Sequence, residues 1–201
     1  MNGFERRREL KKKSILLAAY DLFSTCGIKD VSIAEIAQKA AVSQVSIYNF
    51  FESKENLVRQ AMFALMNEKM KESERVLESE IPFREKLKKL LFISDEATLQ
   101  SIPKFFLSAI NSDPLIVNLL EEYYRSRTEP FIIRLVEQGK KAGCINQDLS
   151  GEAICLFIRA LQSVLVQADL PKNVILDLDS LFFYGLQGTP QITNSTDQVD
   201  V

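Results

Sequence analysis

Residues 43–51 hold several short polar side chains that could recognise double-stranded DNA. Amide side chains pair with adenine in the major groove, and hydroxyl side chains hydrogen bond to bases or phosphates. Gln44 and Asn49 supply amides, while Ser46 and Tyr48 supply hydroxyls. This chemistry requires a helix that presents the side chains to a groove, so the elements around them decide whether it is possible.

Capping signals place these residues in the second of two short helices. Ser32 and Glu35 form an S-x-x-E capping box, which predicts a helix beginning at Ile33. The apolar face of this helix consists of Ile33, Ile36, Ala37 and Ala40. Ser43 caps the next short helix, whose side chains able to pack inward are Val45, Ile47 and Phe51. Ser53 caps a third helix, and together these signals predict a helix-turn-helix.

Spacing alone leaves a second interpretation open, because paired short helices with solvated polar faces occur in many all-α proteins. A longer pattern favours DNA binding. Residues 42–57 follow V-S-x-x-[ST]-[IL]-Y-x-x-F-x-S-K-E-x-L, which closely resembles the N-terminal domain of TetR/AcrR-family transcriptional regulators. The matching residues are Val42, Ser43, Ser46, Ile47, Tyr48, Phe51, Ser53, Lys54, Glu55 and Leu57. Residues 15–27 are similar to the first helix of that family, so the resemblance in motif covers roughly residues 10 to 60.

The resemblance implies a dimeric DNA-binding regulator in which Tyr48 and Lys54 hold phosphates. From their amide groups we expect Gln44 and Asn49 to contact bases. The full set of candidate DNA-contact residues is Ser32, Ser43, Gln44, Val45, Ser46, Tyr48, Asn49 and Lys54.

Two positions depart from the family pattern. Ala41 stands in the turn where the family usually has glycine, and a positive φ there costs an alanine about 1 kcal/mol. We therefore expect a slightly remodelled turn. Phe50 stands where relatives often carry a polar or histidine side chain, so one phosphate contact of the family has no counterpart in this side chain.

Charge is distributed unevenly along the chain. Residues 1–54 hold nine Lys and Arg against six Asp and Glu, a balance of +3, and the remaining residues hold sixteen against twenty-one, a balance of −5. Six of the nine cations fall before Ile15, namely Arg6, Arg7, Arg8, Lys11, Lys12 and Lys13. We expect residues 1–13 to form a basic arm that precedes the first helix and contacts phosphates. The alternative is a merely solvated charge run.

Composition bounds the fold class and the domain organisation. The chain has 201 residues, 46% of them hydrophobic and 26% charged, and its apolar residues recur at helical rather than strand spacing. We expect an all-α protein with an N-terminal three-helix helix-turn-helix domain on a larger C-terminal helical bundle that dimerises. The expected divisions are 1–53 for DNA binding, 54–188 for ligand binding and dimerisation, and 189–201 as a disordered tail.

The middle of the chain predicts further helices and a candidate effector pocket. Helices are expected over 54–78, after Pro82, after Pro103, and from Asp113 to Ala142, with a kink or break at Pro130. The resemblance implies a small-molecule effector between these helices, which we expect to be uncharged or weakly anionic and largely apolar. Candidate contacts are Phe105, Phe106, Tyr123, Tyr124, Arg127 and Phe131. Arg127 could select anions, or it could pair internally with Glu121 or Glu122.

The last two predicted helices, 150–169 and 171–188, are unusually apolar for terminal helices. In the family such a pair forms a four-helix bundle with a second chain, and a large apolar face requires cover. The candidate dimer contacts are Ile154, Phe157, Ile158, Leu161, Leu165, Leu178, Leu181 and Phe182. Burial within the same chain is the alternative.

Several chemistries are excluded by what the chain lacks. It has no histidine, hence no Ser-His-Asp triad and no imidazole metal site, and it has no glycine-rich phosphate loop. Its three cysteines are widely spaced, which favours buried thiols over a disulfide framework. We expect no cofactor, no metal, no catalytic residue and no membrane association, and a cytoplasmic protein. Two hypotheses remain: a repressor released from an inverted-repeat operator by an effector, and an all-α carrier or interaction protein whose helix-turn-helix is incidental.

Overall fold

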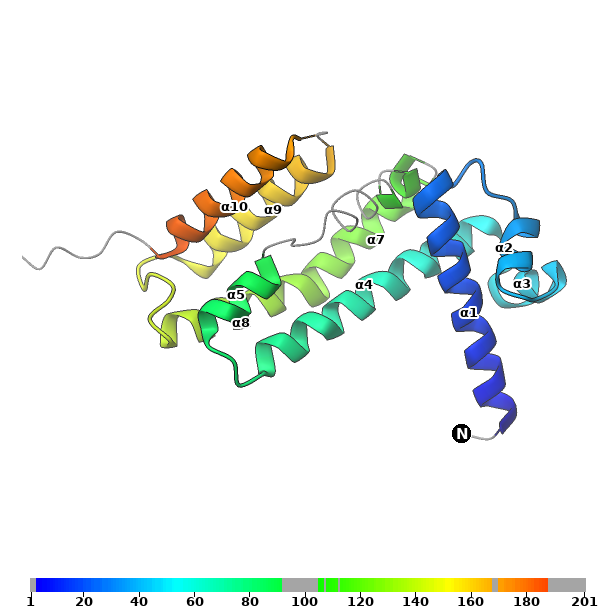
Figure 1. The fold of residues 1–201 in the computed structure, drawn as a ribbon, viewed down its shortest axis with the longest axis horizontal. Helices are drawn as coiled ribbons and strands as arrows, with labels where there is room; N and C mark the ends of the chain where they lie inside the picture. Colours follow the sequence, from blue (N-terminus) through cyan, green and yellow to red (C-terminus); the bar gives the residue numbers. More distant parts are fainter. Residues whose placement is uncertain (1–2, 92–104, 107, 112, 168–169, 188–201) are drawn as a thin grey trace, which may run out of the picture.

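A computed structural model describes residues 3–91, 105–106, 108–111, 113–167 and 170–187, and all regular elements within these ranges are helical (Figure 1). They are α1 (Gly3–Cys26), α2 (Ile33–Lys39), α3 (Gln44–Phe51), α4 (Lys54–Glu78), α5 (Phe83–Leu91), α7 (Leu115–Tyr123), the π-helical segment η1 (Tyr124–Thr128), α8 (Glu129–Lys141), α9 (Gly151–Gln167) and α10 (Lys172–Gln187). Residues 105–106 and 108–111 are helical as well. The all-α prediction is confirmed. The tail 189–201 lies outside the described residues.

α1 begins much earlier than its apolar stripe indicates. The helix starts at Gly3, so the basic segment is not an arm that precedes the first helix but the first turns of that helix. The cause is propensity, because Arg, Glu, Leu and Lys are good helix formers and no proline interrupts them. The buried side chains of α1 start only at Ile15. The apolar pattern therefore predicted the packed part of α1 from Ile15 onward, but it did not predict the exposed part before Ile15.

The predicted caps of the helix-turn-helix are confirmed. Ser32 and Glu35 form the capping box of α2, and the side chains of Ser43 and Ser53 accept from the backbone N–H of Ser46 and Asn56 at the start of α3 and α4. α4 ends at Glu78, as predicted. The short caps therefore determine where the two helices and the long third one begin.

Ala41 adopts the left-handed conformation that the turn requires, with φ of 54°. Its N–H donates to the carbonyl of Gln38 at 3.2 Å, and the N–H of Val42 donates to the carbonyl of Ala37 at 2.9 Å. This pair of bonds is the Schellman motif, which usually ends in glycine. The turn thus keeps the hydrogen bonds that it would make with glycine at this position, and the backbone strain falls on Ala41.

Two hydrophobic cores share the long helix α4. The first joins α1, α2, α3 and the start of α4, and it is completed by Phe105, Ala109 and Ile116 from far along the chain. The second contains Met70 and Leu77 from the end of α4, with residues of α5 and α7–α10. Because one rigid helix belongs to both cores, a displacement of α4 moves side chains in each.

The irregularity expected at Pro130 is a π-helical segment that lies just before it. η1 occupies residues 124–128, and the N–H of Glu129 donates to the carbonyl of Tyr124 rather than to a carbonyl four residues back. Pro130 then falls in the first turn of α8, where a missing N–H costs least. The chain continues in one direction through α7 and α8 without a sharp break (Figure 1).

Candidate nucleic-acid interface

α3 has one face in the core and one face in solvent. Ile47 and Phe51 are fully buried, whereas Gln44, Tyr48 and Asn49 are exposed. Val45, which was expected to pack inward, is instead 67% exposed and lies among the polar residues. An exposed valine on such a face can contact the methyl group of thymine. α3 therefore presents a mixed polar and apolar surface that suits the major groove.

Two serines define the beginning of α3. The hydroxyl of Ser43 accepts from the N–H of Ser46 at 3.2 Å, and the two hydroxyls lie 2.9 Å apart. Ser43 is exposed and Ser46 half-buried. Hydroxyls at a helix N-terminus, beside the unpaired N–H groups of the first turn, are suited to phosphate oxygens.

Both hydrogen-bond donors of Ser32 already have a partner within the chain. Its N–H and its hydroxyl both donate to Oε2 of Glu35, each at 2.7 Å. The hydrogen bonds from the Ser32 hydroxyl and then from its N–H hold the pKa of Glu35 below its ordinary value, and the charge of Lys54 adds to this effect. A phosphate contact by Ser32 therefore competes with the carboxylate of Glu35.

The turn between α3 and α4 fixes the direction of α3 on the scaffold. Glu52 has φ of 64°, and the N–H of Ser53 donates to the carbonyl of Phe51 at 2.7 Å. The amide of Asn56 donates to the same carbonyl at 2.9 Å. Lys54 follows as the first residue of α4 and is half-buried. The strained turn at Glu52 and the role of Asn56 were not predicted from the sequence.

Comparison with known proteins agrees with this geometry. Residues 15–61 match the sequence model of the bacterial regulatory proteins of the tetR family. This match supports a TetR-family regulator. An uncharacterized HTH-type transcriptional regulator of Bacillus subtilis (strain 168), YhgD, is 28% identical over 137 residues, which cover 67% of this chain and 72% of that protein.

Three solved structures share the fold of this chain. A putative transcriptional regulator from Saccharomonospora viridis, in complex with choline, has a TM-score of 0.68 and 20% identity over 85% of this chain and 92% of its own. A putative TetR-family regulator from Mesorhizobium loti has a TM-score of 0.67 and 18% identity, with 90% and 96% covered. The fatty acid degradation regulator FadR from Bacillus halodurans has a TM-score of 0.62 and 18% identity, with 87% and 98% covered. These three structures show that the fold is shared over most of the chain.

The candidate effector contacts of this regulator divide between its two cores. Phe105 and Phe106 pack in the first core, where the ring of Phe105 lies 5.4 Å from that of Tyr20 and 6.2 Å from that of Phe23. Tyr123, Tyr124 and Phe131 pack in or against the second core, and Arg127 is exposed on η1. The structure therefore does not bring the six residues to one site.

Neither of two hollows on the described surface is lined by any of these six residues. One, of about 310 Å³, lies between α8 and α9, over Ile133, Val136 and Cys155. The other, of about 620 Å³, is an open groove along α1, bounded by Leu10, Leu17 and Lys39. In the described parts of the chain no helix is long and apolar enough to cross a membrane, and no group of acidic or cysteine side chains is placed to hold a metal ion.

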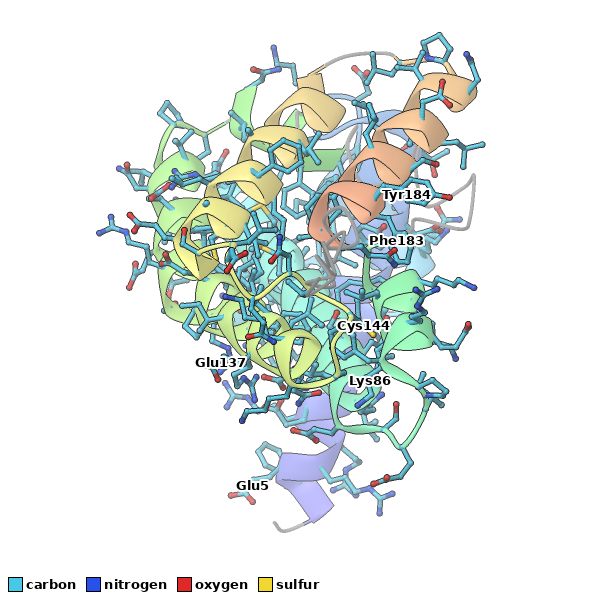
Figure 2. The ribbon with its side chains drawn as sticks, turned by 90° about the vertical axis from the view of Figure 1, so that its left-hand side faces the viewer. Glu5, Lys86, Glu137, Cys144, Phe183 and Tyr184 are labelled. Carbon is cyan, nitrogen blue, oxygen red and sulfur yellow. The ribbon has the colours of Figure 1, made fainter. Side chains whose placement is uncertain are left out.

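The candidate dimer contacts also separate by burial. α9 and α10 lie side by side in both views (Figures 1 and 2). Ile154, Ile158 and Phe182 belong to the second core, and Leu161 and Leu178 are half-buried. Phe157 and Leu181 are exposed, together with Leu156, Leu176 and Tyr184. Leu165 lies in α9, but its side chain is outside the described residues. Of the candidate dimer contacts, Phe157 and Leu181 are therefore the ones whose side chains are exposed for contact with a second copy.

Proposed function

We propose that this regulator is a repressor that binds an inverted-repeat operator as a two-fold dimer and that a small-molecule effector releases it. The observation that carries the DNA-binding part is the two-sided burial of α3. Ile47 and Phe51 anchor the helix in the first core, while Gln44, Tyr48 and Asn49 remain exposed. A helix anchored in this way can enter a groove without unfolding its domain.

The dimer is supported by the exposed apolar side chains of the α9–α10 pair. Leu181 and Tyr184 are 69% and 71% exposed, and Phe157 stacks on Phe182 with ring centroids 5.7 Å apart. Figure 1 shows α9 and α10 on the left of the molecule and α2 and α3 on the right. A second copy on the α9–α10 pair therefore leaves both copies of α3 uncovered. Several exposed large apolar side chains on one pair of helices are typical of an interaction site.

The effector is expected to act through α4. The hydroxyl of Tyr123 donates to Oδ1 of Asn67 at 3.2 Å, and the ring of Phe63 lies 6.0 Å from that of Tyr123, so α7 contacts the middle of α4 directly. Glu121 pairs with Arg125 and Arg159, whereas Arg127 faces solvent. This arrangement favours an apolar ligand between the middle helices over one held by Arg127. Such a ligand shifts the equilibrium only if it prefers one position of α4.

The test of DNA binding is an electrophoretic shift with the DNA upstream of the regulator's own gene at low salt. We expect a shift, with Lys54→Ala weakening binding to all sequences and lowering the salt slope by about one unit. Gln44→Ala should instead relax the preference at one base pair. No shift by the wild-type protein would favour the carrier interpretation. Equal losses for both variants on every sequence would refute the assigned roles.

The test of release is a thermal-shift screen with apolar acids and neutral aromatics, followed by DNA binding in the presence of each hit. We expect at least one compound to raise the melting temperature and to lower the affinity for DNA. Hits that stabilise the protein and leave DNA affinity unchanged would refute the coupling.

A further inference from the structure

Two cations of α1 lie over two aromatic rings of α3. Cζ of Arg8 is 5.4 Å from the centroid of the Phe50 ring, and Nζ of Lys12 is 5.9 Å from that of Phe51. Residues four apart share one face of a helix, and this face continues into Ile15, which is buried in the first core. The face of α1 that packs on α3 therefore extends beyond the core as a cationic edge.

Phe50 explains why Arg8 lies where it does. A guanidinium within about 6 Å of a ring centroid is attracted to the ring face. Phe50 is half-buried against the first core, so its position is fixed, while Arg8 is exposed. A guanidinium that stacks on a ring can still direct the N–H groups in its plane to an acceptor, and planar, bidentate binding of phosphate is characteristic of arginine.

We propose that Phe50 is a platform that holds Arg8 for contact with a DNA phosphate. The proposal rests on the DNA-binding function proposed above. Phe50 directly follows Tyr48 and Asn49, so Arg8 stands beside the end of the DNA-facing helix. Figure 1 shows the N-terminal end of α1 projecting past α2 and α3, on the side of the molecule away from α9 and α10.

The other cations of α1 provide internal controls. Successive residues of a helix are rotated by about 100°, so Arg6 points about 200° around the axis from Arg8 and away from α3. Lys13 borders the groove on another side of α1, with Leu10 and Leu17. The proposal therefore predicts unequal effects for cations that sequence alone treats as one basic run.

The experiment measures anisotropy of a short labelled duplex of random sequence between about 50 and 200 mM NaCl. The slope of log K against log[NaCl] is negative, and Arg8→Ala should reduce its magnitude by about 0.9 for each protomer bound. Arg6→Ala should reduce the magnitude by less than half as much. Phe50→Leu should reduce the magnitude as Arg8→Ala does, although it removes no charge, and Phe50→Tyr should preserve it. The double variant Arg8→Ala/Phe50→Leu should lose no more than either single variant.

Equal losses for Arg8→Ala and Arg6→Ala would overturn the proposal, as would a normal slope for a folded Phe50→Leu. Circular dichroism establishes whether each variant folds. If Phe50→Leu does not fold, the Arg8 and Arg6 pair still decides the outcome. Absence of binding by the wild-type protein is a different result, because it refutes the proposed function rather than the role of Arg8.

Discussion

The guanidinium of Arg59 donates to Oδ2 of Asp113 at 2.8 Å, although 54 positions separate the two residues in the chain. Asp113 is buried, and its other oxygen accepts from the N–H of Leu115, the first residue of α7, at 3.0 Å. Nearby, the N–H of Ile28 donates to the hydroxyl of Ser108 at 3.1 Å. These contacts join residues of the first core, including the start of α4, to residues 108–115.

Removal of the Arg59 side chain should destabilise the protein. Arg59→Ala leaves a buried carboxylate with one partner fewer, and the loss should be about 2 kcal/mol of unfolding free energy in urea. Arg134→Ala is the matched control, because Arg134 also reaches α4, through Glu74, but both side chains are far more exposed. It should cost less than about 1 kcal/mol. Equal costs would mean that Asp113 does not depend on its partner.

Substitution at Ala41 should have the opposite effect. Ala41→Gly relieves a left-handed φ of 54°, and we expect less than about 1 kcal/mol of added stability after the greater freedom of glycine in the unfolded chain is deducted. The neighbour Ala40 has φ of −81°, so Ala40→Gly should destabilise by a similar amount. Thermal unfolding shows whether each of the two substitutions raises or lowers the melting temperature. A lower melting temperature for Ala41→Gly would contradict the strain argument.

We expect the contribution of Glu35 to the stability of α2 to decrease in acid. Hydrogen bonds from Ser32 hold the pKa of Glu35 below its ordinary value of 4.5. The folded form therefore binds this proton less readily than the unfolded chain, so the contribution is present above the ordinary pKa and is lost as pH falls through the folded value. Glu35→Gln can keep the capping box without titrating. The difference in melting temperature between wild type and Glu35→Gln should change below about pH 4.5, and a constant difference would refute the linkage.

A charge on the exposed face of α9 and α10 should separate the proposed dimer. Leu181→Glu places a carboxylate where the two copies are expected to meet, and sedimentation velocity should show a monomer. Leu115→Glu is the control, since Leu115 is also exposed, at 57%, but lies at the start of α7. Phe182 is unsuitable for this test because it is buried in the protomer's own core. A dimer that persists in Leu181→Glu would place the interface elsewhere.

The local signals of this sequence were sufficient to predict most helix starts. Ser32, Ser43 and Ser53 cap the elements that follow them, and Gly27 and Gly143 adopt the positive φ expected of helix stops. Each of these features depends on residues within one helical turn, and a turn is short enough to recognise from residue types alone.

Long-range packing could not be predicted in the same way. Phe105 was assigned to an effector pocket, yet it fills the space between Tyr20 and Phe23 of α1. Ile154 and Phe157 are three residues apart on one apolar stripe, but the first is buried and the second exposed. Helical spacing identifies such a stripe, whereas its division between a core and an interface depends on how the neighbouring helices pack.

Hydroxyl-radical footprinting on the DNA upstream of the regulator's own gene can show whether two copies of α3 read one operator. We expect two protected segments related by a dyad, with centres about 34 Å or a multiple of that distance apart along the helix axis. Leu181→Glu should lose this paired protection at the protein concentration that gives full protection with the wild type. A single unpaired protected segment for the wild-type dimer, or a paired footprint from a protein shown to be monomeric, would show that two copies of α3 do not read one operator together.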